Sequence, residues 1–306
     1  MPHIIEIKNL THSYQKKIPV LNNLSLDIEQ GEIFGLLGPN GSGKSTLFKI
    51  LSTLLFPTKG SILFEKKDLL NSREEVRKHI GVVFQNPSLD KKLSVFENLI
   101  FQGYLYGLKG KKLTQKINTI LEKLDLITRK NDKVEILSGG LKRRVEIAKC
   151  LLHNPKILIL DEPTTGLDPS IRASLWKDIF ALKQEGMTCL ITTHLMDEAE
   201  FCDRIGILDK GYLMALDTPS HLKKNIGGEV VTFKSKNIND LSQKLKKTFS
   251  CSTKILDDEL RAETNNGSDL LTQALKTFPQ EIESVTLSKP TLGDVFIQKT
   301  GHSLEQ

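Results

Sequence analysis

The chain has 306 residues, of which 39% are hydrophobic and 26% charged, and its formal net charge at pH 7 is +6. This length predicts about two domains, and because no uninterrupted apolar run approaches the roughly 18 residues that cross a bilayer, we expect a globular protein that does not span a membrane by itself. Its basic residues stand in short pairs such as Lys66-Lys67, which argues against nucleic acid as a partner, and the first six residues lack the pattern of a secretion signal.

The first thirty residues predict two half-buried antiparallel strands, because apolar and polar residues alternate there. The alternating apolar residues are Ile5, Ile7, Leu24, Leu26 and Ile28. Tyr14 lies in the loop between these strands. An aromatic ring just before a phosphate-binding loop can stack on a purine base, whereas a lone tyrosine more often serves ordinary packing, so the spacing leaves both interpretations open.

A glycine-rich loop follows the continuous apolar stretch at residues 33–37 and satisfies the pattern G-x-x-x-x-G-K-[ST] at Gly38, Gly43, Lys44 and Ser45. Because glycine has no Cβ atom, consecutive backbone N–H groups can turn inward, and the dipole of the following helix adds positive potential. The loop is therefore predicted to cradle a polyphosphate, with Lys44 bridging the β- and γ-phosphate oxygens and the Ser45 hydroxyl ligating Mg²⁺.

The helix after this loop is predicted to bury one face, because its apolar residues recur at i, i+3, i+4, i+7 and i+8. These residues are Leu47, Ile50, Leu51, Leu54 and Leu55. A turn at residues 57–60, a short strand at residues 61–64 and a β-rich stretch at residues 80–84 follow, and Pro87 closes the last of them.

Residues 90–132 change to a helical pattern, which we interpret as an insertion. Ser94 and Glu97 form a capping-box sequence at the start of one helix. A second helix carries the apolar stripe Leu113, Ile117, Ile120, Leu121 and Leu124. The insertion ends at residues 137–140, where Ser138 can cap a further helix. This helix start is a second candidate phosphate site, although a capped surface helix with a flexible start explains the same residues.

Two carboxylates follow the apolar strand at residues 157–160. At the end of a buried parallel strand, Asp161 is expected beside the phosphate loop to hold Mg²⁺, usually through water, and Glu162 is expected to orient or deprotonate a water molecule. A later β-stretch at residues 188–193 ends on His194. One histidine at a strand end is weak evidence of catalysis, but it closes a series of polar residues at the edge where doubly wound sheets bind ligands.

Together these segments resemble the ATP-binding-cassette (ABC) family. The Walker A, Q-loop, signature, Walker B, D-loop and switch-histidine motifs of that family match residues 38–45, Gln85, residues 137–140, residues 157–162, residues 166–168 and His194, in that order. The resemblance covers about residues 3–225. It implies an ATPase that closes as a head-to-tail homodimer, with each ATP between the Walker A loop of one subunit and the signature of the other.

The resemblance also implies residue roles. The loop residues implied in ATP binding are Gly38, Pro39, Asn40, Gly41, Ser42, Gly43, Lys44, Ser45 and Thr46, and those implied for Mg²⁺ are Ser45, Gln85 and Asp161. The implied catalytic set is Lys44, Gln85, Glu162 as general base and His194 as γ-phosphate sensor. Tyr14 would be the adenine platform, and the remaining nucleotide-binding residues are Ser138, Gly139, Gly140 and Asp168, with Ser138 and Gly140 donating to the ATP of the partner subunit. Leu141 stands where Gln is usual, which affects only the contact expected of that side chain.

A subgroup resemblance rests on residues 86–98, 140–144, 193–200 and 291–296. These segments are similar to the ATP-binding subunits of type-2 exporters, the group of the daunorubicin-resistance ATPase. The subgroup implies a separately encoded transmembrane permease as the partner. It also implies a cytoplasmic protein held at the inner face of the cytoplasmic membrane through that permease.

The composition changes after Gly227-Gly228, so we expect an ABC ATP-binding domain at residues 1–226, with a helical subdomain at about residues 90–136, and an accessory domain at residues 227–306. The predicted fold class of the first domain is α/β, a P-loop NTPase core with an antiparallel β subdomain and a helical signature subdomain. The accessory domain contains none of the phosphate-binding or acidic features described above, and a regulatory or dimer-supporting role is expected of it.

The accessory domain is predicted to be a small ferredoxin-like α+β domain, because its expected elements follow the order βαββαβ. Strands are expected at residues 230–234, 254–256, 259–263 and 282–288, with a turn at Asp257-Asp258. The two helix faces expected to be buried comprise Ile238, Leu241, Leu245 and Phe249 in the first helix and Leu271, Ala274, Leu275 and Phe278 in the second. Thr291 to Asp294 are expected to cap a terminal helix.

Two functional interpretations follow from the sequence. In the first, the chain powers a membrane exporter, since ATP binding closes the dimer, hydrolysis opens it, and the movement drives a separate permease. In the second, a soluble ATPase uses the same machinery on a protein assembly. The subgroup segments favour the first interpretation, and they do not indicate a cargo.

Overall fold

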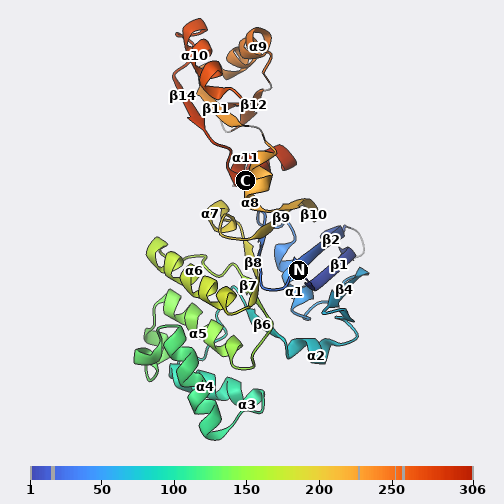
Figure 1. The fold of residues 1–306 in the computed structure, drawn as a ribbon, viewed down its shortest axis with the longest axis vertical. Coiled ribbons are helices and arrows are strands. Elements are labelled where there is room, and N and C mark those ends of the chain that lie inside the picture. Colours follow the sequence, from blue (N-terminus) through green and yellow to red (C-terminus); the bar gives the residue numbers. More distant parts are fainter. Residues whose placement is uncertain (1, 15–17, 227, 252, 257–258, 305–306) are drawn as a thin grey trace. The chain divides into compact units, whose positions relative to one another are not determined.

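The computed structural model describes residues 2–14, 18–226, 228–251, 253–256 and 259–304, which form two compact units, Met1–Leu216 and Asp217–Gln306 (Figure 1). This division falls after residue 216, whereas the sequence placed the domain boundary after residue 226. The intervening helix α8 (Pro219–Lys224) belongs to the second unit, where it packs against α11 (Leu292–Thr300). The predicted boundary residue Gly227 lies outside the described residues.

A six-stranded sheet organises the first unit, with the order β10-β9-β3-β8-β7-β6. Its strands are β3 (Ile33–Leu37), β6 (Ile80–Val83), β7 (Ile157–Asp161), β8 (Thr188–Thr193), β9 (Arg204–Asp209) and β10 (Tyr212–Asp217). The pairs from β9 through β6 are parallel, and every residue of β3, β7 and β8 is buried. Continuous apolar strands of this kind are typical of a parallel sheet covered on both faces.

The register of these strands brings the predicted motifs to one edge of the sheet. Leu37 pairs with Thr193, and Asp161 pairs with Thr192. The residues that follow β3, β7 and β8 are therefore neighbours, although they come from distant parts of the sequence. The helices α1 (Lys44–Leu51), α5 (Gly139–Leu151), α6 (Pro169–Gln184) and α7 (Met196–Ala199) lie around this sheet (Figure 1).

A second sheet in the same unit has the order β2-β1-β4-β5 and confirms the predicted antiparallel strands. It consists of β1 (His3–His12), β2 (Leu21–Glu29), β4 (Lys59–Phe64) and β5 (Lys67–Asp68), and the short helix α2 (Arg73–Arg77) follows. Its inward-facing residues share one core with α1 and the central strands, for example Ile5, Leu26 and Phe64 with Phe34 and Phe48. This core fixes the phosphate loop between the two sheets.

The helix after the phosphate loop is shorter than predicted. It ends at Leu51, and Thr53 adopts a left-handed conformation with φ of +63°. Leu54, which the helical spacing placed on the buried face, is 59% exposed. The prediction was wrong at this residue because a β-branched residue in the left-handed region breaks the 3.6-residue period that the leucines otherwise continue.

The helical subdomain comprises α3 (Val95–Leu105), α4 (Gly110–Lys123) and the 3₁₀ turns η1 (Ile127–Arg129) and η2 (Val134–Ile136). The predicted capping box is present, because Glu97 N–H donates to the Ser94 hydroxyl and Ser94 N–H donates to the Glu97 carboxylate. The predicted apolar stripe of α4 is buried. Helix α3 packs on α4 and on α5, which joins the subdomain to the signature.

The second unit has the ferredoxin-like arrangement that the sequence predicted. Its elements are β11 (Glu229–Lys234), α9 (Ile238–Phe249), β12 (Thr253–Leu256), β13 (Glu259–Thr264), α10 (Gly267–Thr277) and β14 (Ser284–Ser288), and its sheet order is β12-β13-β11-β14. The expected turn at Asp257-Asp258 lies outside the described residues. Leu275 was expected on the buried face of α10 but is 40% exposed, because Leu270 and Ala274 form the buried side of that helix.

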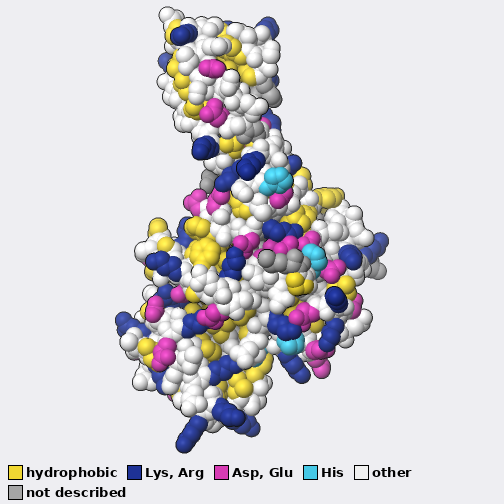
Figure 2. Space-filling model, viewed as in Figure 1, with side chains coloured by type: hydrophobic (Ala, Val, Ile, Leu, Met, Phe, Trp, Pro, Cys, Tyr) yellow, Lys and Arg dark blue, Asp and Glu magenta, His cyan; other side chains and the backbone are white. Residues whose placement is uncertain are grey.

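The helix α11 begins with the predicted capping box of Thr291 and Asp294. Asp294 also accepts a hydrogen bond from Arg261 at 2.9 Å, which ties this helix to β13. On the face shown in Figure 2, basic and acidic side chains are interspersed over the first unit. Within the ranges that the structure describes, no helix combines the length and apolar character that a membrane crossing requires.

Candidate functional site

The phosphate loop has a backbone that only glycine permits at two positions. At Gly38 a Cβ atom would lie 2.2 Å from the carbonyl oxygen of Leu208, and at Gly43 one would lie 2.8 Å from Leu21 Cδ2. Gly43 also has φ of +108° and directly precedes the first residue of α1. Glycine at these two positions therefore lets the loop pack against β9 and the start of β2 and turn tightly into α1, whose N-terminal N–H groups are the kind of donors that bind phosphate oxygens.

Lys44 is held inside this loop. Its side chain is 4% exposed, and Nζ donates to the carbonyl oxygens of Gly38 at 2.6 Å and Pro39 at 3.0 Å. Nζ also lies 3.9 Å from Glu162 Oε1. Burial lowers the pKa of Lys44, and the nearby carboxylates of Glu162 and Asp161 oppose that shift. The ammonium group is thus placed between the loop and the acidic strand end.

A small cavity of about 130 Å³ lies over the loop. It is lined by Val20, Asn40, Gly41, Gly43, Lys44, Ser45, Thr46 and Glu162. A glycine-lined hollow with a lysine, a serine and a threonine in its wall fits a phosphate group, which would accept hydrogen bonds from these side chains.

Tyr14 lies beside the first turn of α1. Its hydroxyl is 3.2 Å from Thr46 Oγ1, and its ring meets the ring of His12 edge to face, with the centroids 4.8 Å apart. More than half of the tyrosine side chain is exposed. The structure therefore places an accessible aromatic ring next to the phosphate loop, where the sequence left stacking and packing open.

The Walker B strand ends in two buried carboxylates with different partners. Asp161 Oδ1 accepts a hydrogen bond from Thr192 Oγ1 at 2.6 Å, and burial raises the pKa of Asp161. Glu162 has a left-handed φ of +44°, a conformation that costs of order 1–3 kcal/mol in a non-glycine residue. Its N–H donates to Thr192 Oγ1 at 3.0 Å, which helps to hold that conformation.

Three predicted catalytic side chains meet at the Glu162 carboxylate. Gln85 Nε2 donates to Oε2 at 3.2 Å, Nδ1 of His194 lies 3.3 Å from Oε1, and Lys44 approaches the same oxygen. The His194 contact lacks hydrogen-bond geometry, so it is a close approach between the two groups. Thr165 Oγ1 adds a hydrogen bond to Oε2 at 3.2 Å. One carboxylate thus faces the phosphate loop, the Q-loop and the end of β8.

The signature residues and the D-loop aspartate belong to a different surface. Ser138 precedes α5, and its hydroxyl accepts a hydrogen bond from Leu141 N–H at 3.4 Å. Ser138, Gly140 and Leu141 line a separate cavity of about 180 Å³, and a Cβ atom on Gly140 would lie 2.2 Å from Ile171 Cγ2. Asp168 is exposed before α6. Gly139, Ser138, Gly140 and Asp168 are absent from the lining of the Walker A cavity.

Sequence reasoning missed Arg143, a buried charge on the signature helix. Its guanidinium donates to the carbonyl oxygens of Asp161, Glu162, Pro163 and Phe84 and pairs with Glu146. Burial lowers the pKa of Arg143 and raises that of Glu146, while each group opposes the shift of the other. Helical periodicity held a signal for it, because Arg143 lies four and eight residues before the buried Ile147 and Leu151.

Sequence reasoning also missed Glu198 of α7, a carboxylate that is 1% exposed. It accepts hydrogen bonds from the hydroxyls of Thr164, just after Walker B, and Thr193, just before His194. Arg172 Nε lies 3.8 Å from it. The spacing predicted this segment only as a mark of the subgroup, because nothing in it shows that the carboxylate turns inward.

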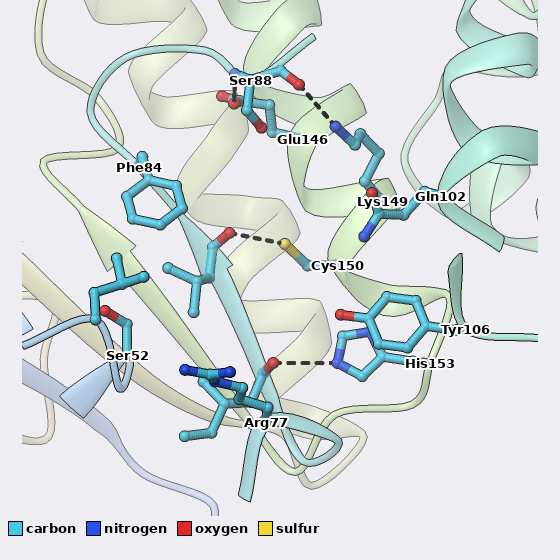
Figure 3. A pocket seen from close by; sticks show the side chains of 13 residues that line it. Ser52, Arg77, Phe84, Ser88, Gln102, Tyr106, Glu146, Lys149, Cys150 and His153 are labelled. Carbon is cyan, nitrogen blue, oxygen red and sulfur yellow. Dashed lines mark hydrogen bonds between the residues drawn. The ribbon is translucent and has the colours of Figure 1, made fainter. Parts of the chain in front are cut away.

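A larger cavity of about 320 Å³ lies beside the Q-loop (Figure 3). The ring of Tyr106 stacks on His153 with centroids 4.1 Å apart, and His153 Nε2 lies 3.1 Å from the Ile80 carbonyl oxygen. Cys150 Sγ donates to the Val82 carbonyl at 3.2 Å, and burial raises the pKa of its thiol to about 12, so the thiol stays protonated and unreactive near neutral pH. Phe84, which precedes Gln85, forms part of the wall.

Comparison with known proteins settles the family. Residues 21–165 match the sequence model of the ABC transporter family. The daunorubicin resistance ATP-binding protein DrrA3 of Streptomyces coeruleorubidus is 34% identical over 287 residues, which cover 92% of this chain and 91% of that protein. The chain belongs to the ABC transporter family. Its resemblance to the daunorubicin-resistance group is confirmed.

Another relative is much longer than the segment that it shares with this chain. The probable multidrug ABC transporter ATP-binding protein YbhF of Escherichia coli (strain K12) is 42% identical over 220 residues, but these cover 72% of this chain and only 38% of YbhF. The chain therefore spans less than two fifths of that relative.

Solved structures agree with the fold. CbiO1 of Clostridium perfringens, part of the transporter complex CbiONQ, has 29% identity and a TM-score of 0.69, covering 82% of this chain and 97% of its own. The dimeric cassette MJ0796, bound to ADP and phosphate, has 31% identity and a TM-score of 0.63, covering 70% of this chain and 98% of its own. The predicted P-loop NTPase fold class is thus confirmed, and ATP is the nucleotide that such ABC domains bind.

Proposed function

We propose that this ABC ATPase supplies energy to an exporter by hydrolysing ATP with the residues gathered at Glu162. The observation that carries the proposal is the meeting of Gln85, His194 and Lys44 at one buried carboxylate beside the phosphate loop. A buried base that faces both the γ-phosphate position and a hydrogen-bonding amide is what water attack on a phosphoryl group requires.

In the proposed reaction, the loop from Gly38 to Thr46 holds the phosphates through backbone N–H groups and Lys44. Lys44 is bonded to two loop carbonyls, and it exchanges these partners for β- and γ-phosphate oxygens, which form stronger charge-assisted bonds. Glu162 accepts the proton of the attacking water, and His194 contacts the γ-phosphate. Tyr14 supplies the accessible ring on which the adenine stacks.

Ser45, Gln85 and Asp161 would hold Mg²⁺, because their hydroxyl, amide and carboxylate oxygens are the ligands this ion prefers. The ion would neutralise phosphate charge when bound. Asp161 fits the role, since it is buried, precedes Glu162 and is held at Oδ1 by the Thr192 hydroxyl.

The proposed site is completed by a second copy of the chain in a head-to-tail dimer. Ser138 and Gly139 are exposed at the start of α5, whose first N–H groups can donate to the γ-phosphate of the partner. Asp168 is exposed at the start of α6 and would lie in the same interface. The dimeric MJ0796 cassette supports pairing of such domains.

We further propose a separately encoded transmembrane permease as the partner, at the inner face of the cytoplasmic membrane. The relatives named for daunorubicin resistance and multidrug transport support export, and CbiO1 supports assembly into a larger transporter complex. Leu54 and Tyr106 are exposed and line the cavity of Figure 3, and they offer a surface that a permease segment would cover.

The test is Glu162→Gln, which keeps the shape of the side chain and removes its basicity. ATP binding should persist while steady-state hydrolysis falls by roughly two to four orders of magnitude, and ATP should trap a dimer detectable by size-exclusion chromatography. Near-normal hydrolysis would remove Glu162 as the base. Co-purification of the chain from cells with a soluble protein assembly, and without a permease, would instead favour a non-transport ATPase.

A further inference from the structure

We propose that Arg143 is a positioning residue for hydrolysis, which holds the backbone around Glu162 and Gln85 from the signature helix α5. This inference rests on the proposed function, because it takes Glu162 as the base and Gln85 as its neighbour. Arg143 itself touches neither ATP nor the attacking water. It acts through four main-chain carbonyl groups that belong to the Walker B end and the Q-loop.

The contacts use every nitrogen of the guanidinium. Nε donates to the Pro163 carbonyl at 2.8 Å, and Nη2 donates to the carbonyls of Asp161 at 3.3 Å and Glu162 at 3.1 Å. Nη1 donates to the Phe84 carbonyl and to Glu146 Oε2, the latter at 3.1 Å. Of the protein side chains, only the planar guanidinium, with its five N–H donors, can satisfy this many oxygen acceptors in different directions.

Burial makes these contacts consequential. Arg143 is 7% exposed and Glu146 3%, so solvent screens the pair only weakly, and removing the guanidinium would leave Glu146 and several main-chain carbonyls without this buried hydrogen-bond donor. Glu146 in turn accepts a hydrogen bond from Ser88 N–H at 2.7 Å, three residues after Gln85. The Q-loop is therefore held by α5 on both sides of Gln85, directly at Phe84 and through Glu146 at Ser88.

The strained backbone at Glu162 indicates what the hydrogen bonds of Arg143 hold in place. A left-handed backbone at a glutamate persists only where its surroundings determine it. Arg143 fixes the carbonyls of the preceding, central and following residues, and these orient the peptide planes that set the direction of the Glu162 side chain. Because the same helix begins at the signature, a shift of α5 is transmitted to the base and to Gln85 together.

This arrangement predicts a particular kinetic change. Among the described residues, the hydrogen-bond partners of Arg143 lie outside the loop from Gly38 to Thr46, so its loss should leave ATP affinity unchanged. It should lower kcat by roughly ten- to hundredfold, since small displacements of a catalytic group have effects of that size. Arg143→Met removes all the donors, and Arg143→Lys keeps the buried charge opposite Glu146 but offers one nitrogen in place of three. We expect Lys to restore folding but not kcat.

Arg204→Met is the matched control. Arg204 is a half-buried arginine at the start of β9, where it pairs with Asp27 and Glu32 at the opposite edge of the sheet. Arg204→Met should lower the unfolding temperature as much as Arg143→Met does, or less, and should leave kcat unchanged. The comparison separates a catalytic effect of Arg143 from general loss of stability, because both variants remove a network of charged hydrogen bonds.

The decisive experiment is a double-mutant cycle on purified full-length protein, with ATP affinity and single-turnover hydrolysis measured for wild type, Arg143→Met, Glu162→Gln and the double variant. If Arg143 acts through Glu162, its loss should have little further effect in the Glu162→Gln background. Additive effects of the two substitutions on hydrolysis would overturn the inference. So would a wild-type kcat in Arg143→Met or a kcat restored by Arg143→Lys. A loss of ATP affinity in Arg143→Met and Arg143→Lys as large as their loss of kcat would overturn it too. Near-normal turnover of Glu162→Gln alone would overturn the proposed function, which the cycle thereby tests separately.

Discussion

The carboxyl edge of the six-stranded sheet and the core of the C-terminal unit bury different kinds of side chains. At the sheet edge, Lys44, Arg143, Asp161, Glu162 and Glu198 are each less than a tenth exposed. The core of the C-terminal unit instead consists of apolar residues such as Val231, Phe233, Leu241 and Leu245. Within the described part of that unit, the buried polar side chains are Ser242, Thr253 and Asp294.

This difference teaches where function resides in the chain. Burying a charge costs free energy unless it is paired and hydrogen-bonded, so a cluster of buried charges persists only where many contacts hold it. The sheet edge provides those contacts through Thr192, Arg143 and the glycine loop. The C-terminal unit buries one described carboxylate, Asp294, which is paired with Arg261, and places other charges in surface pairs such as Lys244 with Glu281, which contribute little to stability.

The largest expected effect is on the buried charge of the phosphate loop. Lys44→Ala should weaken ATP binding by roughly ten- to hundredfold, because one cation acts on the ground-state phosphates through charge-assisted hydrogen bonds. Lys49→Ala is the control on the same helix, since Lys49 is exposed and carries the same charge. Titration with a fluorescent ATP analogue measures both. Equal affinities for the two variants would contradict the role of Lys44.

Substitutions in the apolar core of the other region should change its stability and have no effect on ATP binding. Leu245→Ala removes a fully buried side chain from α9 and should destabilise the C-terminal unit by about 2–5 kcal/mol. Leu275→Ala on α10 removes the same atoms from a 40% exposed position and should cost less. Denaturant unfolding measures both, and ATP affinity should not change in either. A parallel loss of ATP affinity would mean that the two regions are not energetically separate.

Removing the C-terminal unit should have the smallest effect on nucleotide affinity. A chain ending at Leu216 and one ending at Ile226 should both bind ATP as the full chain does, while dimerisation, ATPase rate or coupling changes. The longer truncation keeps α8 without α11, which exposes Leu222 and Ile226 and favours aggregation. Calorimetric titration with ATP decides. A monodisperse truncation that no longer binds ATP would withdraw the proposed domain division.

The sequence predicted the fold well wherever one local pattern was enough. Continuous apolar stretches predicted β3 and β7, a further β-rich stretch predicted β8, and the capping boxes at Ser94 and Thr291 are present. It failed at Leu54 and Leu275, because helical periodicity does not show where a helix ends or which residues at the border of an apolar face are covered. Backbone conformation and packing decide both.

The candidate site was predictable only in part, for a related reason. Motif spacing identified Gln85, Glu162 and His194, and the register of the parallel strands brings them together. Arg143 and Glu198 were missed because their partners are main-chain carbonyls and threonine hydroxyls from other segments. Helical periodicity can place Arg143 on the buried face of its helix, but it does not show which groups of other segments the charge contacts.

The measurement that tests the central claim most directly is the ATPase activity of a mixture of Lys44→Ala and Gly139→Asp chains. A Cβ atom at Gly139 would meet only Leu167 Cδ2, at 3.3 Å, so this variant should fold while placing a carboxylate at the signature. Each variant alone should be inactive. If two chains share each site, random exchange gives about a quarter of the wild-type sites and partial activity. A mixture as inactive as its components, with subunit exchange verified, would contradict the shared site.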